Sequence, residues 1–283
     1  MEVAQTIESM RKLTEAARRS GRKIGFVPTM GALHVGHVSL IEAAAKECDF
    51  VVVSIFVNPT QFGPGEDFEK YPRLIEADLE ICRQAGVDLV FAPATREMYP
   101  AEHLAWVAVE KLTEPLCGQS RPEHFRGVTT VCAKLFNIVA PDAAYFGQKD
   151  AQQAIVIKRM VQDLNMPLRI VVCPTVREPN GLAVSSRNQY LSAQQKSDAG
   201  KIYQSLEKCR QMIAGGVRDP RQIIGQMQNV LQQVKSIEIE YISLVDAETL
   251  ETIERIAGRV LAAVAVRLGP ARLIDNILVD AGR

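Results

Sequence analysis

Two histidines three residues apart, His34 and His37, lie in a stretch that also contains Gly31 and Gly36. The stretch follows an apolar β-type run and precedes an apolar helical pattern, so we expect a strand-turn-helix connection. The amide groups and dipole at the beginning of a helix favour an anion, and glycines let the main chain approach a phosphate oxygen closely. Imidazole N–H groups can donate hydrogen bonds to the same oxygens. We therefore predict that this turn binds phosphate.

Surface histidines and a metal site are the alternatives for this pair. A metal would need further ligands, yet the other two histidines are His103 and His124, and no cysteine lies close in sequence. The turn has neither the Gly-Lys-Ser/Thr of a P-loop nor the G-x-G-x-x-G dinucleotide fingerprint. Its H-x-G-H pattern instead resembles the signature of the nucleotidylyltransferase and class I aminoacyl-tRNA synthetase superfamily. That resemblance implies that ATP is cleaved between the α and β phosphates.

A second cluster, Gly147 to Asp150, also joins the end of a β-type run to a helical pattern. Gly147 permits close approach of a ligand, and Lys149 offers a compact positive charge for phosphate. Asp150 can cap the helix or accept hydrogen bonds from ribose hydroxyls. The alternative is an ordinary beginning of a surface helix.

A third cluster, Val184 to Asn188, follows the Asn180-Gly181 turn and contains two serines and an arginine. Arginine donates in a planar fork and serine hydroxyls adapt to it, so the cluster suits a phosphate tail. Such residues are also ordinary in loops. Their position at the expected domain junction favours the phosphate hypothesis.

The loop from Asn58 to Gly65 follows the second predicted strand. Gln61 in this loop can donate and accept hydrogen bonds without charge, which suits a hydroxylated substrate. A flexible lid without substrate contact is the alternative. The Gly63-Pro64-Gly65 segment is expected to be a lid or its hinge.

Alternating β-type and helical patterns in the first two-thirds of the chain predict an α/β fold with a Rossmann-like parallel sheet and crossover helices. Ligands bind such sheets at the carboxyl ends of the strands. The expected strands are 23–27, 50–57, 89–92, 143–146 and 168–172. The expected helices are an N-terminal amphipathic one within 1–20, then 38–48, 74–85, 128–139 and 152–164.

The pattern changes after about Pro174. Two long helices are expected at 192–214 and 220–234, followed by strands at 237–245, 259–266 and 271–279, whose short connections indicate an antiparallel sheet. We therefore expect two domains. Residues 1–175 would form the Rossmann-like domain, and residues 176–283 a smaller α+β domain that closes over the active site.

The composition excludes several classes of protein. Lysine plus arginine equal aspartate plus glutamate at 33 each, so no overall positive field exists to gather nucleic acid. We see no secretory signal and no apolar stretch long enough for a membrane helix, which predicts a cytoplasmic protein without membrane partners. The six cysteines are far apart, so they predict buried thiols and neither a zinc site nor disulfides.

Five ordered motifs together resemble one family, the pantothenate synthetases, which are AMP-forming ligases that join pantoate to β-alanine. The motifs are PTMGALHVGH, FVNPTQFGPGEDFEKYPR, RPEHFRGV, YFGQKDAQQ and VSSRN. The resemblance is close over residues 20 to 190. It implies attack of a pantoate carboxylate on the α phosphorus, a pantoyl adenylate, use of Mg²⁺ with ATP, and a homodimer.

The resemblance also implies the site residues. The expected ATP site consists of Met30, Gly31, Ala32, Leu33, His34, Val35, Gly36, His37, Gly147, Gln148, Lys149, Asp150, Val176, Val184, Ser185, Ser186 and Arg187. The donors expected to stabilise charge on the phosphates are His34, His37, Lys149, Ser186 and Arg187. Gln61 and Gln153 would hold pantoate, with Gln61 also near β-alanine, and Asp78 would lie near the metal.

The sequence departs from the family pattern at four positions: Gln148 replaces a usual Glu, Ala151 a common aromatic residue, Val184 a common Met and Glu123 a common Gly. None of them is a residue that we assign to chemistry. Three alternatives stay open: a nucleotidylyltransferase that leaves AMP on its product, a tRNA-charging enzyme, and a non-catalytic nucleotide sensor. The tRNA enzyme is disfavoured because the chain has no net basic charge, and a sensor has no need for both histidines together with Lys149 and Arg187.

Overall fold

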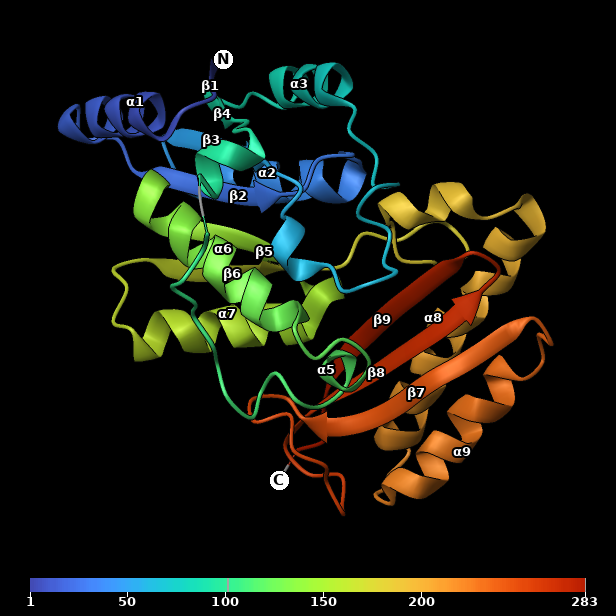
Figure 1. Cartoon of the computed structure of the whole chain (residues 1–283). Helices are drawn as coiled ribbons and strands as arrows, with labels where there is room; N and C mark the ends of the chain where they lie inside the picture. The colour runs from blue at the N-terminus through green and yellow to red at the C-terminus, as the bar shows by residue number, and fades with distance from the viewer. Residues whose placement is uncertain (101, 283) are drawn as a thin grey trace. The chain divides into compact units, whose positions relative to one another are not determined.

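The computed structural model describes residues 1–100 and 102–282 and consists of two units (Figure 1). The first unit contains Met1–Gly147 and Gln152–Pro174. The second contains Gln148–Ala151 and the described chain from Thr175 onward. The main division thus lies one residue before the position expected from the sequence. The grouping of Gln148–Ala151 with the second unit was not expected.

Six parallel strands form the sheet of the first unit in the order β1-β4-β3-β2-β5-β6. They are β1 (Glu2–Ala4), β2 (Ile24–Thr29), β3 (Phe50–Ile55), β4 (Leu89–Phe91), β5 (Ala143–Gly147) and β6 (Arg169–Cys173). The strand order reverses between β2 and β5, and open parallel sheets bind ligands at such a point. The Rossmann-like prediction is confirmed, and the His34 turn follows one of these two strands.

Helices cover both faces of this sheet (Figure 1). The long ones are α1 (Ile7–Arg19), α2 (Val35–Glu47), α3 (Ile75–Gln84), α6 (His124–Val139) and α7 (Ala151–Asp163), and the short ones are η1 (Pro59–Gln61), α4 (Thr95–Met98) and α5 (Cys117–Ser120). Successive strand residues point to opposite faces. Phe26 and Val52 therefore pack with α1, α6 and α7, whereas Val27, Val51 and Val53 pack with α2 and α3.

The boundaries in the first unit differ most from the prediction at two places. Residues 2–4 form the edge strand β1, and α1 begins only after Thr6, whose side chain accepts from the main-chain N–H of Ser9. A three-residue strand is too short to produce a recognisable alternation. Helix α6 begins at His124 instead of Val128, because the apolar spacing that predicts the helix starts one turn after the helix does.

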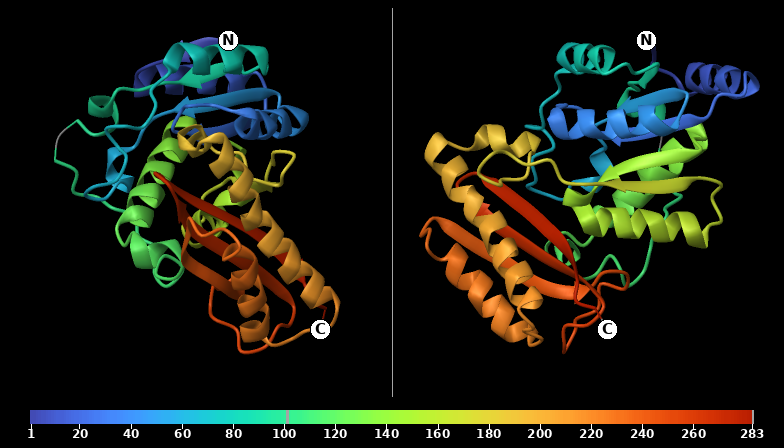
Figure 2. Two further views of the ribbon diagram at one scale, coloured as in Figure 1. Left: turned by 90° about the vertical axis from the view of Figure 1, so that its right-hand side faces the viewer. Right: turned by 180° about the vertical axis from the view of Figure 1, so that it is seen from behind.

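The second unit is an antiparallel sheet covered by two helices. The strands β7 (Ile237–Asp246), β8 (Arg259–Leu268) and β9 (Ala271–Asp280) lie in that order. Both views in Figure 2 show α8 (Ala193–Ala214) and α9 (Pro220–Leu231) on the same side of the sheet. Their apolar faces bury Ile202, Leu206 and Ile223 against the strands. Two 3-10 turns, η2 (Gln148–Asp150) and η3 (Ser186–Tyr190), complete the unit.

All six cysteines are buried and none of them forms a disulfide in the described part of the chain, which confirms the prediction of buried thiols. Burial raises the pKa of Cys132 and of Cys209 to about 12. These thiols stay protonated at neutral pH and are therefore poor nucleophiles.

Candidate functional site

The two histidines cap helix α2 reciprocally. His34 is the N-cap residue, and its Nδ1 accepts from the main-chain N–H of Gly36 at 3.2 Å. His37 lies at the third helical position, and its Nδ1 accepts from the main-chain N–H of His34 at 3.2 Å. The ring centroids are 4.1 Å apart. Three-residue spacing therefore brings both rings together over the first turn of the helix.

These main-chain bonds also define the tautomer of each neutral ring. A nitrogen that accepts a hydrogen bond carries no proton, so the proton of the neutral imidazole lies on Nε2. Both rings are half-buried. The beginning of α2 thus places two Nε2–H donors at the positive end of the helix dipole, which is suitable for phosphate oxygens.

Asp78 of α3 holds the turn that precedes these histidines. Its two carboxylate oxygens accept from the main-chain N–H groups of Ala32 at 2.9 Å and Leu33 at 2.7 Å. Gly31 and Ala32 both have positive φ angles, 81° and 51°. A residue other than glycine is strained in that region, so outside contacts must hold Ala32 there. Asp78 supplies these contacts across 45 residues of sequence.

The structure places Asp78 beneath the turn and only 2% exposed. Burial raises the pKa of its carboxyl group, and the two amide bonds act in the opposite direction. Among the residues that the structure describes, no group of three or more His, Cys, Asp or Glu side chains can hold a metal ion. The metal role of Asp78 stays a prediction.

Gln61 lies in η1 and connects two loops of the first unit. It is 8% exposed; its Oε1 accepts from Asn58 Nδ2 at 3.1 Å, and its Nε2 lies 3.2 Å from Met30 Sδ. The Gln61 side chain therefore reaches the beginning of the histidine turn. Gln61 thus lies next to Met30, the first residue of the Met30–His37 segment, and its substrate role stays a prediction.

Several residues that support Gln61 were not identified as functional from the sequence. Asn58 Nδ2 also donates to the Gly127 carbonyl at 3.1 Å, and a Cβ at Gly127 would lie 2.2 Å from the Thr60 carbonyl oxygen. Arg121 and His124 Nδ1 both donate to the Gln61 carbonyl, at 3.2 and 2.8 Å. The motif RPEHFRGV contains Arg121, His124 and Gly127, and the motif FVNPTQFGPGEDFEKYPR contains Asn58, but neither motif indicates these roles.

Arg121 in turn forms an ion pair with Glu66, beyond the end of η1. Burial favours the neutral acid, but the hydrogen bonds from Arg121 hold the pKa of Glu66 below its usual value. The charged pair ties the loop after Gln61 to the segment that leads into α6. The loop that we expect to act as a lid is therefore held at Glu66 by this ion pair.

Gln153 lies half-buried in the first turn of α7. Its neighbour Gln152 is structural: Oε1 accepts from the N–H of Cys117 at 3.0 Å, and Nε2 donates to the carbonyls of Leu112 and Pro115. The substrate role of Gln153 stays a prediction.

The second unit brings Val176, Val184 and the Ser185–Arg187 segment together. The N–H of Val184 donates to the Val176 carbonyl at 3.0 Å, and Arg177 and Ala183 form a β-bridge, so both valines lie at the open end of a short hairpin. Ser185 then caps η3, because its Oγ accepts from the N–H of Arg187 at 3.3 Å. Ser186 and Arg187 are half-buried.

Lys149 lies in η2 of the same unit, and its side chain is 20% exposed. Its Nζ is 3.7 Å from the carboxylate of Asp150. Strand β9 contacts both η2 and η3. The candidate phosphate donors thus form two groups, the histidine turn in the first unit and Lys149 with Ser186 and Arg187 in the second.

Comparisons with known proteins agree on one family. The family model described as pantoate-beta-alanine ligase matches residues 2–278. A pantothenate synthetase of Moorella thermoacetica is 55% identical over 280 residues, which cover 99% of each chain. A pantothenate synthetase structure from Thermus thermophilus is 44% identical, with a TM-score of 0.94 over 100% of both chains. The pantoate-beta-alanine ligase structure from Francisella tularensis, described as complexed with beta-gamma ATP and beta-alanine, is 36% identical, with a TM-score of 0.81 over 98% of this chain and 97% of that one.

Proposed function

This chain belongs to the pantoate-beta-alanine ligase family, and we propose on that premise that it condenses pantoate with β-alanine at the expense of ATP. The products are pantothenate, AMP and pyrophosphate. The observation that carries the assignment of the site is the reciprocal capping of α2 by His34 and His37, which fixes two Nε2–H donors at a helix N-terminus.

In the first half-reaction, a carboxylate oxygen of pantoate attacks the α phosphorus of Mg-ATP. A carboxylate O–P bond forms, and the bond from the α phosphorus to the bridging oxygen breaks, so pyrophosphate leaves. Mg²⁺ bound with the nucleotide would neutralise part of the charge on the phosphates. No protein nucleophile is required. Negative charge increases on the phosphate oxygens, and hydrogen-bond donors already directed at them lower the barrier.

We assign the donors by unit. His34 and His37 of the first unit donate through Nε2 to the phosphates, at the positive end of the α2 dipole. In the second unit, Lys149 and Arg187 each supply a positive charge and Ser186 supplies a hydroxyl, and we assign these groups to the negative charge on the phosphate oxygens. Arginine suits this role because its planar fork matches two phosphate oxygens.

In the second half-reaction, the neutral amine of β-alanine attacks the acyl carbon of pantoyl adenylate. An N–C bond forms and the acyl C–O bond breaks, so AMP departs with the bridging oxygen that came from the pantoate carboxylate, and the nitrogen loses a proton to solvent. Gln61 and Gln153 hold pantoate, and Gln61 also lies near β-alanine. The loop after Gln61 must exclude water, because an acyl adenylate hydrolyses readily.

A product analysis tests this function directly. The purified protein is incubated with Mg-ATP and pantoate, with and without β-alanine, and all products are identified by mass spectrometry. We expect AMP, pyrophosphate and pantothenate, with pantothenate appearing only when the amine is present. ADP as product would contradict cleavage at the α phosphate, and an AMP-conjugated final product would identify a nucleotidylyltransferase instead.

Replacing Gln61 by alanine is expected to raise the KM for pantoate by about tenfold, the effect of about 1.4 kcal/mol from lost substrate hydrogen bonds. The KM for ATP should change little. Steady-state kinetics with each substrate varied provides the measurement. Gln84→Ala, which removes an exposed amide bound to Glu80 on α3, serves as the control, and an unchanged pantoate KM in Gln61→Ala would exclude the role.

Replacing Gly36 by alanine is expected to displace the His34 ring. A Cβ at this position would lie 2.9 Å from His34 Cε1 and 3.0 Å from its Nδ1. Loss of the His34 cap costs about 1 kcal/mol, and alanine stabilises a helix by about as much relative to glycine. We therefore expect a nearly normal melting temperature and an adenylation rate lower by roughly tenfold. The matched control is Gly225→Ala in α9, where the new Cβ meets nothing within 4 Å. Equal rates in the two variants would show that the ring position is unimportant.

The cytoplasmic location and the homodimer are further proposals. Within the described residues no helix has the length and apolar character needed to cross a bilayer. The equal numbers of basic and acidic residues also give no reason to expect a polyanionic partner. The homodimer follows from the family resemblance, and light scattering at several concentrations would test it.

A further inference from the structure

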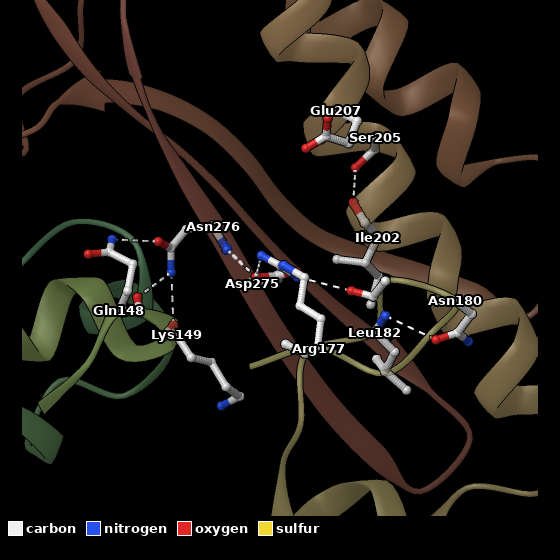
Figure 3. A network of polar contacts seen from close by, with 12 residues as sticks. Gln148, Lys149, Arg177, Asn180, Leu182, Ile202, Ser205, Glu207, Asp275 and Asn276 are labelled. Atoms are coloured by element: carbon white, nitrogen blue, oxygen red, sulfur yellow. Dashed lines mark hydrogen bonds and ion pairs between the residues drawn. The ribbon is translucent and has the colours of Figure 1, made fainter. Parts of the chain in front are cut away.

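Asn276 of strand β9 contacts the segment that carries Lys149, although 127 residues separate them in sequence. Its Nδ2 donates to the main-chain carbonyls of Gln148 at 3.0 Å and Lys149 at 2.9 Å, and its Oδ1 accepts from Gln148 Nε2 at 2.8 Å (Figure 3). Asn276 is 5% exposed. Both amide hydrogens of a buried side chain are therefore used on one turn, η2.

The contact with Asn276 gives a physical reason for one departure from the family pattern, Gln148 in place of a usual Glu. The resemblance leads to glutamate at this position, but an ionised carboxylate has no hydrogen to donate to Asn276 Oδ1. The amide of Gln148 supplies it. In this chain the side chains at 148 and 276 thus form a matched pair of amides.

The strand that carries Asn276 is itself fixed from its other side. Successive residues of a strand point to opposite faces, and Asp275 accordingly points away from η2, toward Arg177 (Figure 3). Arg177 donates to both Asp275 oxygens, at 2.5 and 3.0 Å, and to the Gly181 carbonyl at 3.0 Å. Its guanidinium also lies 3.9 Å from the ring centroid of Tyr203.

The charged pair is well enclosed. Asp275 is 4% exposed. Burial raises the pKa of its carboxyl group, while Arg177 and the more distant Lys149 act in the opposite direction. Separating the two charges of such a buried pair would strongly destabilise the fold. The ion pair therefore holds β9 in place at Asp275.

Strand β9 therefore supports both sets of candidate phosphate donors in the second unit, Lys149 and the Ser185–Arg187 segment. On one side Asn276 holds η2, and on the other Asp275 holds the Arg177–Ala183 hairpin that leads into Ser185–Arg187. The lysine side chain is long and flexible, so the position of its ammonium group depends on where its main chain is fixed. In Figure 3 the Lys149 side chain extends away from Asn276.

We propose that Asn276 is a positioning residue for adenylation: it fixes the main chain at Lys149, so that the ammonium group and the Ser185–Arg187 donors keep one geometry. The inference rests on the proposed function of Lys149 as a phosphate donor. A displacement of about 1 Å in such a donor can cost on the order of a hundredfold in rate.

The test is a double-mutant cycle of Asn276 with Lys149. Asn276→Ala removes all three hydrogen bonds. Asn276→Asp keeps the shape of the side chain but sets carboxylate oxygens against the carbonyls of Gln148 and Lys149. The aspartate variant replaces the alanine variant in the test if the latter does not fold. We expect the kcat for pyrophosphate release to fall at least roughly tenfold in each variant, with the KM for pantoate and β-alanine within about twofold of wild type. In the Lys149→Ala background, the same change at 276 should cost less than about twofold, because it acts through the lysine.

The control is Asn137→Asp in α6, which changes a side chain that donates to the Ala133 carbonyl at 2.8 Å and should leave kcat unchanged. Melting temperatures of all variants are measured alongside. A normal kcat in a folded Asn276 variant, or the same fold-loss with and without Lys149, would overturn the positioning role. If the wild-type protein makes no pantothenate, the proposed function fails instead, so the two failures are distinguishable.

Discussion

His37→Ala is expected to slow formation of the acyl adenylate by roughly a hundredfold or more, corresponding to about 3 kcal/mol of transition-state stabilisation. The variant loses an Nε2–H donor at the N-terminus of α2, where negative charge increases during attack on the α phosphorus. Release of pyrophosphate in a single turnover, with Mg-ATP and pantoate but no amine, provides the measurement. The KM for β-alanine should change little, because the amine enters after this step.

His37 also caps the helix, so the two effects must be separated. Its Nδ1 accepts from the N–H of His34 at 3.2 Å. Glutamine at this position of a capping box can accept the same bond. His37→Gln should therefore recover the melting temperature while adenylation stays slow, and His103→Ala controls for loss of a half-buried histidine elsewhere in the unit. Adenylate formation at the wild-type rate by His37→Ala would exclude the donor role.

Asp78→Ala is expected to lower the free energy of unfolding by about 4 kcal/mol, because two main-chain N–H groups lose their acceptors and each unsatisfied buried donor costs about 1 to 3 kcal/mol. Asp78→Asn keeps one acceptor oxygen and should cost about 2 kcal/mol. Both variants should also lose activity, because the strained turn at Gly31 and Ala32 is no longer held. Urea denaturation and the adenylation rate measure the two effects.

The matched control for Asp78 is Asp219→Ala in the second unit. Asp219 accepts from the N–H of Arg221 at 2.9 Å at the exposed beginning of α9, so its loss should cost only about 1 kcal/mol and leave activity normal. Normal stability and activity in both Asp78 variants would exclude the role in the turn. If stability is normal but more Mg²⁺ is needed for half-maximal rate, the metal role predicted from the sequence is favoured instead.

The interactions that hold the site in place could not be predicted from the sequence. Asp78 has no local pattern that connects it with Ala32 and Leu33, and nothing around Asn276 indicates Gln148. Such hydrogen bonds join residues far apart in the chain, whereas hydrophobic periodicity and capping signals reach only a few residues. The grouping of Gln148–Ala151 with the second unit has the same origin.

By itself, the sequence determined the order of the longer strands and helices, though not the short elements β1, η1, α4 and α5, and it singled out the residues that follow the strands. It also determined that His34 and His37 lie on one helical turn, because spacing and capping act within a few residues. The tertiary structure alone decided which distant side chain holds each loop: Asp78 under the histidine turn, Asn58 against Gly127, and Asn276 on the Lys149 segment. Those contacts depend on how separate elements pack, and packing brings together positions whose distance along the chain carries no information about their distance in space.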